Sequence, residues 1–330
     1  MRIMVNSHNS LRKVDIVSML TVNRNTRIKT DVALKKSMSK EAVAGILFVL
    51  PAIIFICVFL VLPAILAFGY SFQQYNMLKP TQKVFIGLTN YIDVLKNPAF
   101  YKSLFNTVYF AAIVVPLQTI VALGLALLVN TKLKTSKVAR ICFFSPVVTS
   151  MVVVAILWTF LYNKDSGLIN SLLNAIGIQS QPFLLSEKQA MNSIIFMSIW
   201  QAAGYQMMIF LAGLQDVPGE LYEAASLDGC NWWDKFKNVT LPCIKNVSSF
   251  VILITTIQAF KLFTQPYIMT GGGPNESTKT LAYMIYEQGF QYRNVGYSCA
   301  IAVIFFLVIL IVSGVVKKIC NVTGDLGERL

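Results

Sequence analysis

The sequence lacks most of the side chains from which enzyme active sites are built. Its one histidine, His8, lies in a polar N-terminal stretch, which removes most histidine-based catalysis and metal binding. None of the six cysteines forms a C-x-x-C pair, so we expect neither a zinc site nor a disulfide framework. The sequence has no G-x-x-x-x-G-K-[ST] loop to cradle a nucleotide phosphate and no Ser/His/Asp set. We therefore expect no catalytic residues, no metal, no cofactor and no enzymatic activity of this chain by itself.

Charge is also scarce. Charged residues make up 13% of the chain, whereas a soluble globular domain carries about 25%. Hydrophobic residues make up 55%. A large soluble core would not explain these values, because a core still needs a polar shell. The simplest explanation is that much of the surface is buried in a lipid bilayer.

Long apolar stretches recur along the chain. A membrane-spanning helix needs about 20 predominantly apolar residues, and six stretches satisfy this requirement. They run roughly over residues 42–72, 104–130, 139–162, 190–214, 246–269 and 295–316. The sequence thus predicts an all-α membrane protein with six transmembrane helices. These helices form a domain over residues 42–319, and residues 1–41 and 320–330 are tails.

Basic residues are concentrated beside the apolar stretches. The tail 1–41 holds nine Lys and Arg, and more follow in the loop after the second span and after the sixth span. Because cytoplasmic loops are enriched in Lys and Arg, we expect both termini to be cytoplasmic. The net charge is +13, but the basic residues flank apolar runs and form no single patch, so we expect no nucleic-acid binding. The tail 1–41 is polar and basic with little apolar periodicity, and we expect it to be a disordered arm near anionic lipid. The basic residues after the second span are Lys132, Lys134, Lys137 and Arg140, and those after the sixth span are Lys317 and Lys318.

The predicted spans contain no clear Asp or Glu at mid-membrane depth. Carriers that couple transport to protons or sodium usually place ionisable residues there, so ion coupling is not expected. The charged exception is Lys261, about 24 Å along the fifth span from Lys245. Its ammonium group either reaches the interface or lines a wet cavity, or it contacts an anionic solute. If the chain transports a solute, the energy comes from outside the bilayer.

The loop 215–242 departs from the basic trend, with five acidic residues against two lysines. Pro218 suits the first turn of a helix, and acidic residues favour the positive N-terminal end. Asp228-Gly229 should end this helix, because glycine tolerates the left-handed conformation. A second short helix with two tryptophans follows. The loop is either an interfacial hairpin that packs against its own bundle or a docking element for a cytoplasmic partner. The first helix carries an apolar stripe of Leu221, Ala224, Ala225 and Leu227.

This loop resembles a known sequence motif. Glu223-Ala224-Ala225, followed after three residues by Gly229 and then by Leu241-Pro242, is similar to the EAA loop of ABC-importer permeases. Val239 stands where that pattern often has isoleucine. Residues 266–281 resemble the outer segment of the larger permease subunit of maltose-type and glycerol-phosphate-type importers. Together with Pro146, Trp158 and residues 167–170, the resemblance covers roughly residues 42–319.

The resemblance implies a type I ABC importer permease-like bundle in the inner membrane of a prokaryote. The implied partners are a second homologous permease, two copies of a cytoplasmic P-loop ATPase and an extracellular solute-binding protein. ATP hydrolysis would take place on the ATPase subunits, and the solute would be a carbohydrate. In this family the EAA loop forms a coupling helix that lies in a groove of the ATPase. The resemblance thus assigns ATPase coupling to Glu223, Ala224, Ala225, Asp228 and Gly229.

The same resemblance suggests a solute path along the fourth and fifth spans. The candidates in the fourth span are Ser198, Gln201 and Tyr205, whose spacing places them near one face of the helix. The candidates in the fifth span, Thr255 and Gln258, also lie near one face. The alternative is that these polar groups hydrogen-bond between helices, which is common in membrane bundles. Two other function classes remain open: an ion-independent channel or secondary carrier, and a membrane scaffold without transport. ATP-dependent uptake would separate the importer from both.

Overall fold

The computed structural model describes residues 43–78, 81, 83–131 and 134–320. The predicted basic tail 1–41 and nearly all of the predicted C-terminal tail lie outside these ranges. Two compact units are present, Met1–Leu66 and Ala67–Leu330, and we describe each by itself.

The first apolar stretch forms one helix, Val43–Tyr70, with no buried side chain in its most apolar part. Residues 43–56 are α-helical, a wider π-helical turn η1 covers Cys57–Val61, and α2 covers Leu62–Tyr70. The wide turn ends two residues before Pro63 and contains Phe59, four residues before the proline. The proline ring has no N–H and would clash with the carbonyl four residues earlier in a regular α-helix. A helix of this length, about 42 Å, exceeds the roughly 30 Å thickness of the hydrocarbon core. The predicted first span is confirmed.

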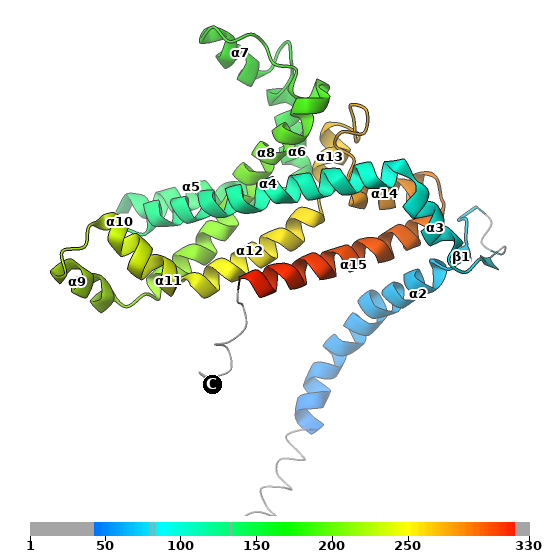
Figure 1. Ribbon diagram of the computed structural model, residues 1–330, viewed down its shortest axis with the longest axis horizontal. Coiled ribbons are helices and arrows are strands. Elements are labelled where there is room, and N and C mark those ends of the chain that lie inside the picture. Colours follow the sequence, from blue (N-terminus) through cyan, green and yellow to red (C-terminus); the bar gives the residue numbers. More distant parts are fainter. Residues whose placement is uncertain (1–42, 79–80, 82, 132–133, 321–330) are drawn as a thin grey trace, which may run out of the picture. The chain divides into compact units, whose positions relative to one another are not determined.

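The second unit is built from long apolar helices. α4 (Pro98–Val129), α8 (Glu187–Gln215) and α15 (Val295–Ile319) are each long and apolar enough to span a membrane. The stretch Lys245–Met269 also passes and consists of α12 (Lys245–Phe260) and α13 (Thr264–Met269). Figure 1 shows α4, α12 and α15 running alongside one another. The predicted second, fourth, fifth and sixth spans are therefore helices with nearly the predicted limits.

The third predicted span is not a straight helix. α5 (Lys134–Val148) and α6 (Met151–Leu161) meet at an angle of 97°. Two local features separate them. Pro146 has no N–H for the Cys142 carbonyl, which instead accepts a hydrogen bond from the Ser145 hydroxyl at 3.0 Å. Ser150 then takes extended backbone angles (φ −54°, ψ 130°), so the expectation of one continuous helix over 139–162 is wrong.

Two separate apolar cores hold the second unit together. One lies toward the ends where α4 and α15 begin, and the other toward the ends where α4 and α8 finish. The first includes Phe110, Ile194 and Ile301, and the second includes Met207 and Phe210. All five side chains are buried. Apolar packing is therefore interrupted partway along the bundle.

Short elements cover the end of the bundle where α4 and α15 begin (Figure 1). β1 (Gln73–Gln74) pairs antiparallel with β2 (Val84–Phe85), and α3 (Thr89–Lys96) leads into α4. α14 (Leu281–Tyr286) and the π-helical turn η4 (Glu287–Gln291) precede α15. Between α6 and α8 lie α7 (Leu168–Ala175) and the 3-10 turn η2 (Phe183–Leu185).

The segment before α14 is fixed by charge and by hydrogen bonds to α4. The Lys279 ammonium lies 2.7 Å from a Glu287 carboxylate oxygen and 3.1 Å from one of Glu276. Burial lowers the pKa of Lys279, but the hydrogen bonds and charges of the two carboxylates outweigh this, so its pKa lies above the ordinary value. The Asn106 amide of α4 donates to the backbone carbonyls of Glu276 and Lys279, at 2.8 and 2.9 Å. These bonds attach the segment to α4 and to the turn that follows α14.

Candidate functional site

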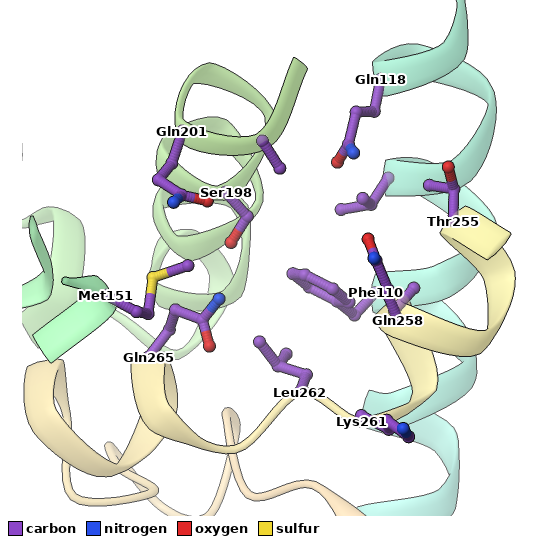
Figure 2. A pocket seen from close by; sticks show the side chains of 13 residues that line it. Phe110, Gln118, Met151, Ser198, Gln201, Thr255, Gln258, Lys261, Leu262 and Gln265 are labelled. Carbon is purple, nitrogen blue, oxygen red and sulfur yellow. The ribbon is translucent and has the colours of Figure 1, made fainter. Parts of the chain in front are cut away.

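A half-open cavity of about 210 Å³ lies between helices of the second unit. Figure 2 shows Gln118, Thr255 and Gln258 on one side of it, facing Ser198 and Gln201 on the other. Amide and hydroxyl groups dominate its polar lining, and none of the lining residues is acidic. The lining comprises Phe110, Val114, Gln118, Met151, Ser198, Gln201, Ala202, Thr255, Gln258, Ala259, Lys261, Leu262 and Gln265.

The cavity occupies the level at which the two apolar cores are interrupted. On α4, Gln118 stands one turn from Val114 of the first core and one turn from Ala122 of the second. On α12, Thr255 stands one turn from Val251 of the second core and from Ala259 of the first. Polar side chains from separate helices therefore form one layer between two apolar regions.

Four of the five side chains predicted for the solute path line this cavity: Ser198, Gln201, Thr255 and Gln258. Tyr205 does not, and 39% of its surface is exposed. The prediction missed Gln118 and Gln265. Gln118 is the single glutamine of the 32-residue α4, and such an isolated amide in an apolar span is a signal that could have identified it.

Some of these polar groups also connect helices. The Gln201 amide donates to the Pro146 carbonyl of α5 at 3.3 Å, and the Gln206 amide donates to the Thr255 hydroxyl at 3.3 Å. The interhelical alternative therefore holds for Gln201 and Thr255. In the described part of the chain, the buried Ser198 hydroxyl has no hydrogen-bond partner. Because an unpaired buried hydroxyl costs free energy, Ser198 is suited to bind a group that enters the cavity.

Lys261 is exposed and is the C-cap residue that follows α12. It contributes to the cavity lining but lies at the edge of the view in Figure 2, apart from the facing amides. Within residues 43–320, outside the gaps given above, no three His, Cys, Asp or Glu side chains are grouped so that they could hold a metal ion.

The loop after α8 forms the predicted helix–turn–helix. α9 (Gly219–Leu227) ends at Asp228, and Gly229 has a positive φ of 77°. The Cys230 N–H donates to the Ala225 carbonyl at 2.9 Å and the Gly229 N–H donates to the Ser226 carbonyl at 3.2 Å. These two bonds define a Schellman turn, which needs a left-handed residue at the glycine position. The predicted helix end at Asp228-Gly229 is confirmed.

The second half of the loop is capped and attached to the first. α10 (Trp232–Lys235) continues into the π-helical turn η3 (Phe236–Thr240) and α11 (Leu241–Cys243). Asn231 and Asp234 cap α10 reciprocally, at 3.0 and 3.1 Å. The Lys235 ammonium donates to the Ser226 hydroxyl at 2.7 Å, and the Tyr222 and Thr240 hydroxyls lie 3.0 Å apart. The two halves of the loop therefore form one unit.

This loop exposes apolar side chains. Leu227 is 90% exposed, Trp232 66% and Trp233 60%. Of the predicted apolar stripe, Ala225 is buried, whereas Leu221, Ala224 and Leu227 are exposed. The stripe therefore does not pack mainly against its own bundle. Among the predicted coupling residues, Glu223, Ala224, Asp228 and Gly229 are exposed as well.

Comparison with known proteins places this arrangement in a family. Residues 118–319 match the family described as binding-protein-dependent transport system inner membrane component. The chain belongs to this family. As a member it is a permease component of a transporter and not an enzyme. The predicted class, a multi-pass permease subunit of an ABC importer in the inner membrane, is confirmed.

Individual relatives cover nearly the whole permease. It is 38% identical over 280 residues to the probable ABC transporter permease protein YurN of Bacillus subtilis, which covers 84% of this chain and 95% of the relative. It is 33% identical over 289 residues to the trehalose/maltose transport system permease protein MalF of Thermococcus litoralis, covering 87% and 96%.

A solved structure shares the fold of the permease. It belongs to a bacterial ABC transporter involved in the import of the acidic polysaccharide alginate. The match has a TM-score of 0.76 and 22% identity, and it covers 88% of this chain and 99% of the other. The expected type I importer permease fold is therefore confirmed. The cytoplasmic location of the termini stays a prediction.

Proposed function

We propose that the permease carries a carbohydrate through the cavity between its two apolar cores. The supporting observation is the lining, in which amides and hydroxyls from α4, α8, α12 and α13 surround about 210 Å³. Each glutamine side chain offers donors and acceptors, which match the hydroxyl groups of a sugar. Phe110 adds an aromatic surface. Similarity to trehalose/maltose and arabinooligosaccharide transport system permease proteins favours the same solute class.

The proposed transporter contains partners that supply energy and solute. A second homologous permease completes the path, two copies of a P-loop ATPase bind on the cytoplasmic side, and an extracellular binding protein delivers the solute. The loop 215–242 is the proposed ATPase contact because it exposes Glu223 together with Leu227, Trp232 and Trp233. Glu223 accepts charge-assisted hydrogen bonds from a basic groove in this proposal. Ala225, which is buried, acts by holding the turn.

The first test is purification followed by transport. The tagged permease, extracted gently from its own membranes, is expected to copurify with a second six-span permease and a P-loop ATPase. Reconstituted in vesicles with the binding protein, the complex is expected to take up a labelled oligosaccharide only when ATP is supplied. Uptake without ATP would favour a channel or secondary carrier, and a folded chain isolated without partners would favour a scaffold.

The second test concerns the cavity. Gln258→Leu keeps the approximate size of the side chain but removes its donors and acceptor. Since one hydrogen bond contributes about 0.5–1.5 kcal/mol, we expect the apparent KM of uptake to rise about two- to tenfold. Gln258 is exposed in the cavity, so folding should not suffer. The control is Tyr205→Phe, outside the lining, which should leave KM unchanged. If wild type and both variants had equal KM values, the proposal that the solute passes through this cavity would be wrong.

A further inference from the structure

The helix α3 has exposed apolar side chains on its outer face. Ile92 and Leu95 of α3 and its N-cap residue Leu88 are 49%, 51% and 61% exposed, and their spacing of four and three residues places them on one face. The opposite face, with Asn90 and Val94, is buried. Val94 belongs to the first apolar core, so α3 carries apolar side chains on both faces, whereas a helix on a water-exposed surface keeps its outer face polar.

Both hydrogens of the buried Asn90 amide group are used. The Asn90 amide donates to the Ser71 carbonyl at 2.9 Å and to the Gln73 carbonyl at 3.0 Å. Gly296 at the start of α15 lies so close that an added Cβ would be 3.2 Å from the Asn90 amide nitrogen. Asn90 therefore fixes the rotation of α3, and the outward direction of its apolar face is a built feature.

This apolar face adjoins the lipid-facing side of a membrane span. The Tyr101 hydroxyl of α4 donates to the Leu95 carbonyl at 2.8 Å and so connects the two helices. Tyr101, Phe105 and Val108 are 52%, 67% and 43% exposed and lie on one face of α4. α4 is long and apolar enough to span a membrane, so exposed apolar side chains on it are suited to contact acyl chains. The exposed apolar residues at α3 therefore continue the exposed apolar face of α4.

One lysine lies on this face of α3, and another lies directly before β2, the strand that precedes the helix. Lys96, four residues after Ile92, is exposed at the C-terminal end of α3. The exposed Lys83 places its ammonium 4.7 and 4.6 Å from the ring centres of Tyr70 and Tyr75. Lysine and tyrosine beside an apolar face are typical of the boundary between the hydrocarbon core and the headgroups.

We propose that α3 lies in the interfacial layer of the bilayer, at the bundle end opposite the loop 215–242. Leu88, Ile92 and Leu95 enter the boundary of the acyl chains, and Lys83 and Lys96 contact anionic phospholipid headgroups. Amphipathic helices of this type bury their apolar face about 5–10 Å into that boundary. The contact fixes the depth of the second span at its entry. Figure 1 shows α3 at the start of α4, and α9 and α10 at the other end of the bundle.

Spin-label accessibility tests this placement. Ile92→Cys and Asp93→Cys are made in a chain whose native cysteines are replaced by serine, and the assembled transporter is placed in nanodiscs of phosphatidylcholine and phosphatidylglycerol. For each label we compare its accessibility to oxygen, which concentrates in lipid, with its accessibility to a water-soluble nickel complex. The ratio of the two is expected to be at least about threefold higher at position 92 than at position 93, which lies 100° further around the helix. Equal accessibility to the nickel complex at both positions would overturn the proposal. Protection at 92 that arises only on adding the solute-binding protein would overturn it as well, and would assign the face to that protein.

A matched variant tests the headgroup contact. Lys96→Gln is expected to lower the ratio of oxygen to nickel accessibility of the label at position 92 in nanodiscs that contain phosphatidylglycerol. In nanodiscs of phosphatidylcholine alone the same variant should leave this ratio unchanged. An identical effect in both lipids would contradict the contact with anionic headgroups. Amide hydrogen exchange of the unmodified chain gives a second readout that needs no cysteine replacement. The α3 amides should exchange more slowly in the anionic nanodiscs, and equal rates in the two lipids would contradict the proposal.

Discussion

Gly229→Val is expected to stop solute uptake while ATP hydrolysis by the assembled transporter continues. Gly229 holds a φ of 77°, and this angle costs a residue with a side chain about 1–3 kcal/mol, most of all a β-branched one. Valine should therefore open the Schellman turn and release the hydrogen bond from Cys230 to Ala225. The direction of α10 relative to α9 would change, and with it the surface offered to the ATPase. We expect uptake to fall at least about tenfold, measured in vesicles with ATPase activity recorded in parallel.

A second glycine in the same loop provides the control. Gly219 lies in the first turn of α9, and an added Cβ at either Gly219 or Gly229 would meet no atom within 4 Å. The two sites thus offer equal space, but Gly229 alone has a positive φ. Gly219→Val should leave uptake within about twofold of wild type, since surface substitutions usually change stability by no more than about 0.5 kcal/mol. Normal uptake by Gly229→Val would refute the coupling role assigned to this turn.

Gly204→Ala is expected to prevent correct packing of α8 against α5. An added Cβ would lie 2.1 Å from the Phe143 carbonyl oxygen and 3.1 Å from the Phe144 Cα, and both are backbone atoms that cannot rotate away. Overpacking of this kind costs about 1–3 kcal/mol or more, because the helices must separate. We expect a melting temperature lower by several degrees or a loss of monodisperse protein in size-exclusion chromatography. A larger residue, as in Gly204→Leu, should abolish recovery of folded protein.

The matched control is Gly124→Ala. Gly124 also lies inside a long membrane span, α4, but a Cβ there would meet nothing within 4 Å. Replacing glycine by alanine in an open helical site favours the helix by about 1 kcal/mol, so this variant should be as stable as wild type or slightly more so. If Gly204→Ala melted at the same temperature as Gly124→Ala, the close approach of α5 and α8 would be ruled out.

Hydropathy and turn chemistry predicted much of this fold. The fourth span, expected over 190–214, is α8 over Glu187–Gln215, because a long apolar run determines a helix in lipid almost by itself. The end of α9 was predicted from Asp228-Gly229, since few residues besides glycine hold a left-handed angle at low cost. In both cases the decisive interaction is local in the sequence.

Features that depend on contacts between distant helices could not be predicted this way. In a membrane span both the lipid-facing and the core-facing sides are apolar, so periodicity does not show which side faces the cavity. The resemblance and the helical spacing therefore group Tyr205 with Ser198 and Gln201, although Tyr205 does not line the cavity, and they omit Gln118 and Gln265, which do. The 97° bend between α5 and α6 was missed for a related reason, because hydropathy reports how apolar a segment is and not its direction.

The polar layer between the two apolar cores has a mechanical consequence. Close-packed apolar cores resist deformation, since shifting one side chain disturbs all its neighbours. Amide groups such as those of Gln118, Gln201 and Gln258 can exchange one hydrogen-bond partner for another at little net cost. Apolar packing is therefore interrupted at the level that holds the cavity, while α4 and α8 run through it unbroken. Side chains at this level can change partners without disturbing the close-packed cores on either side.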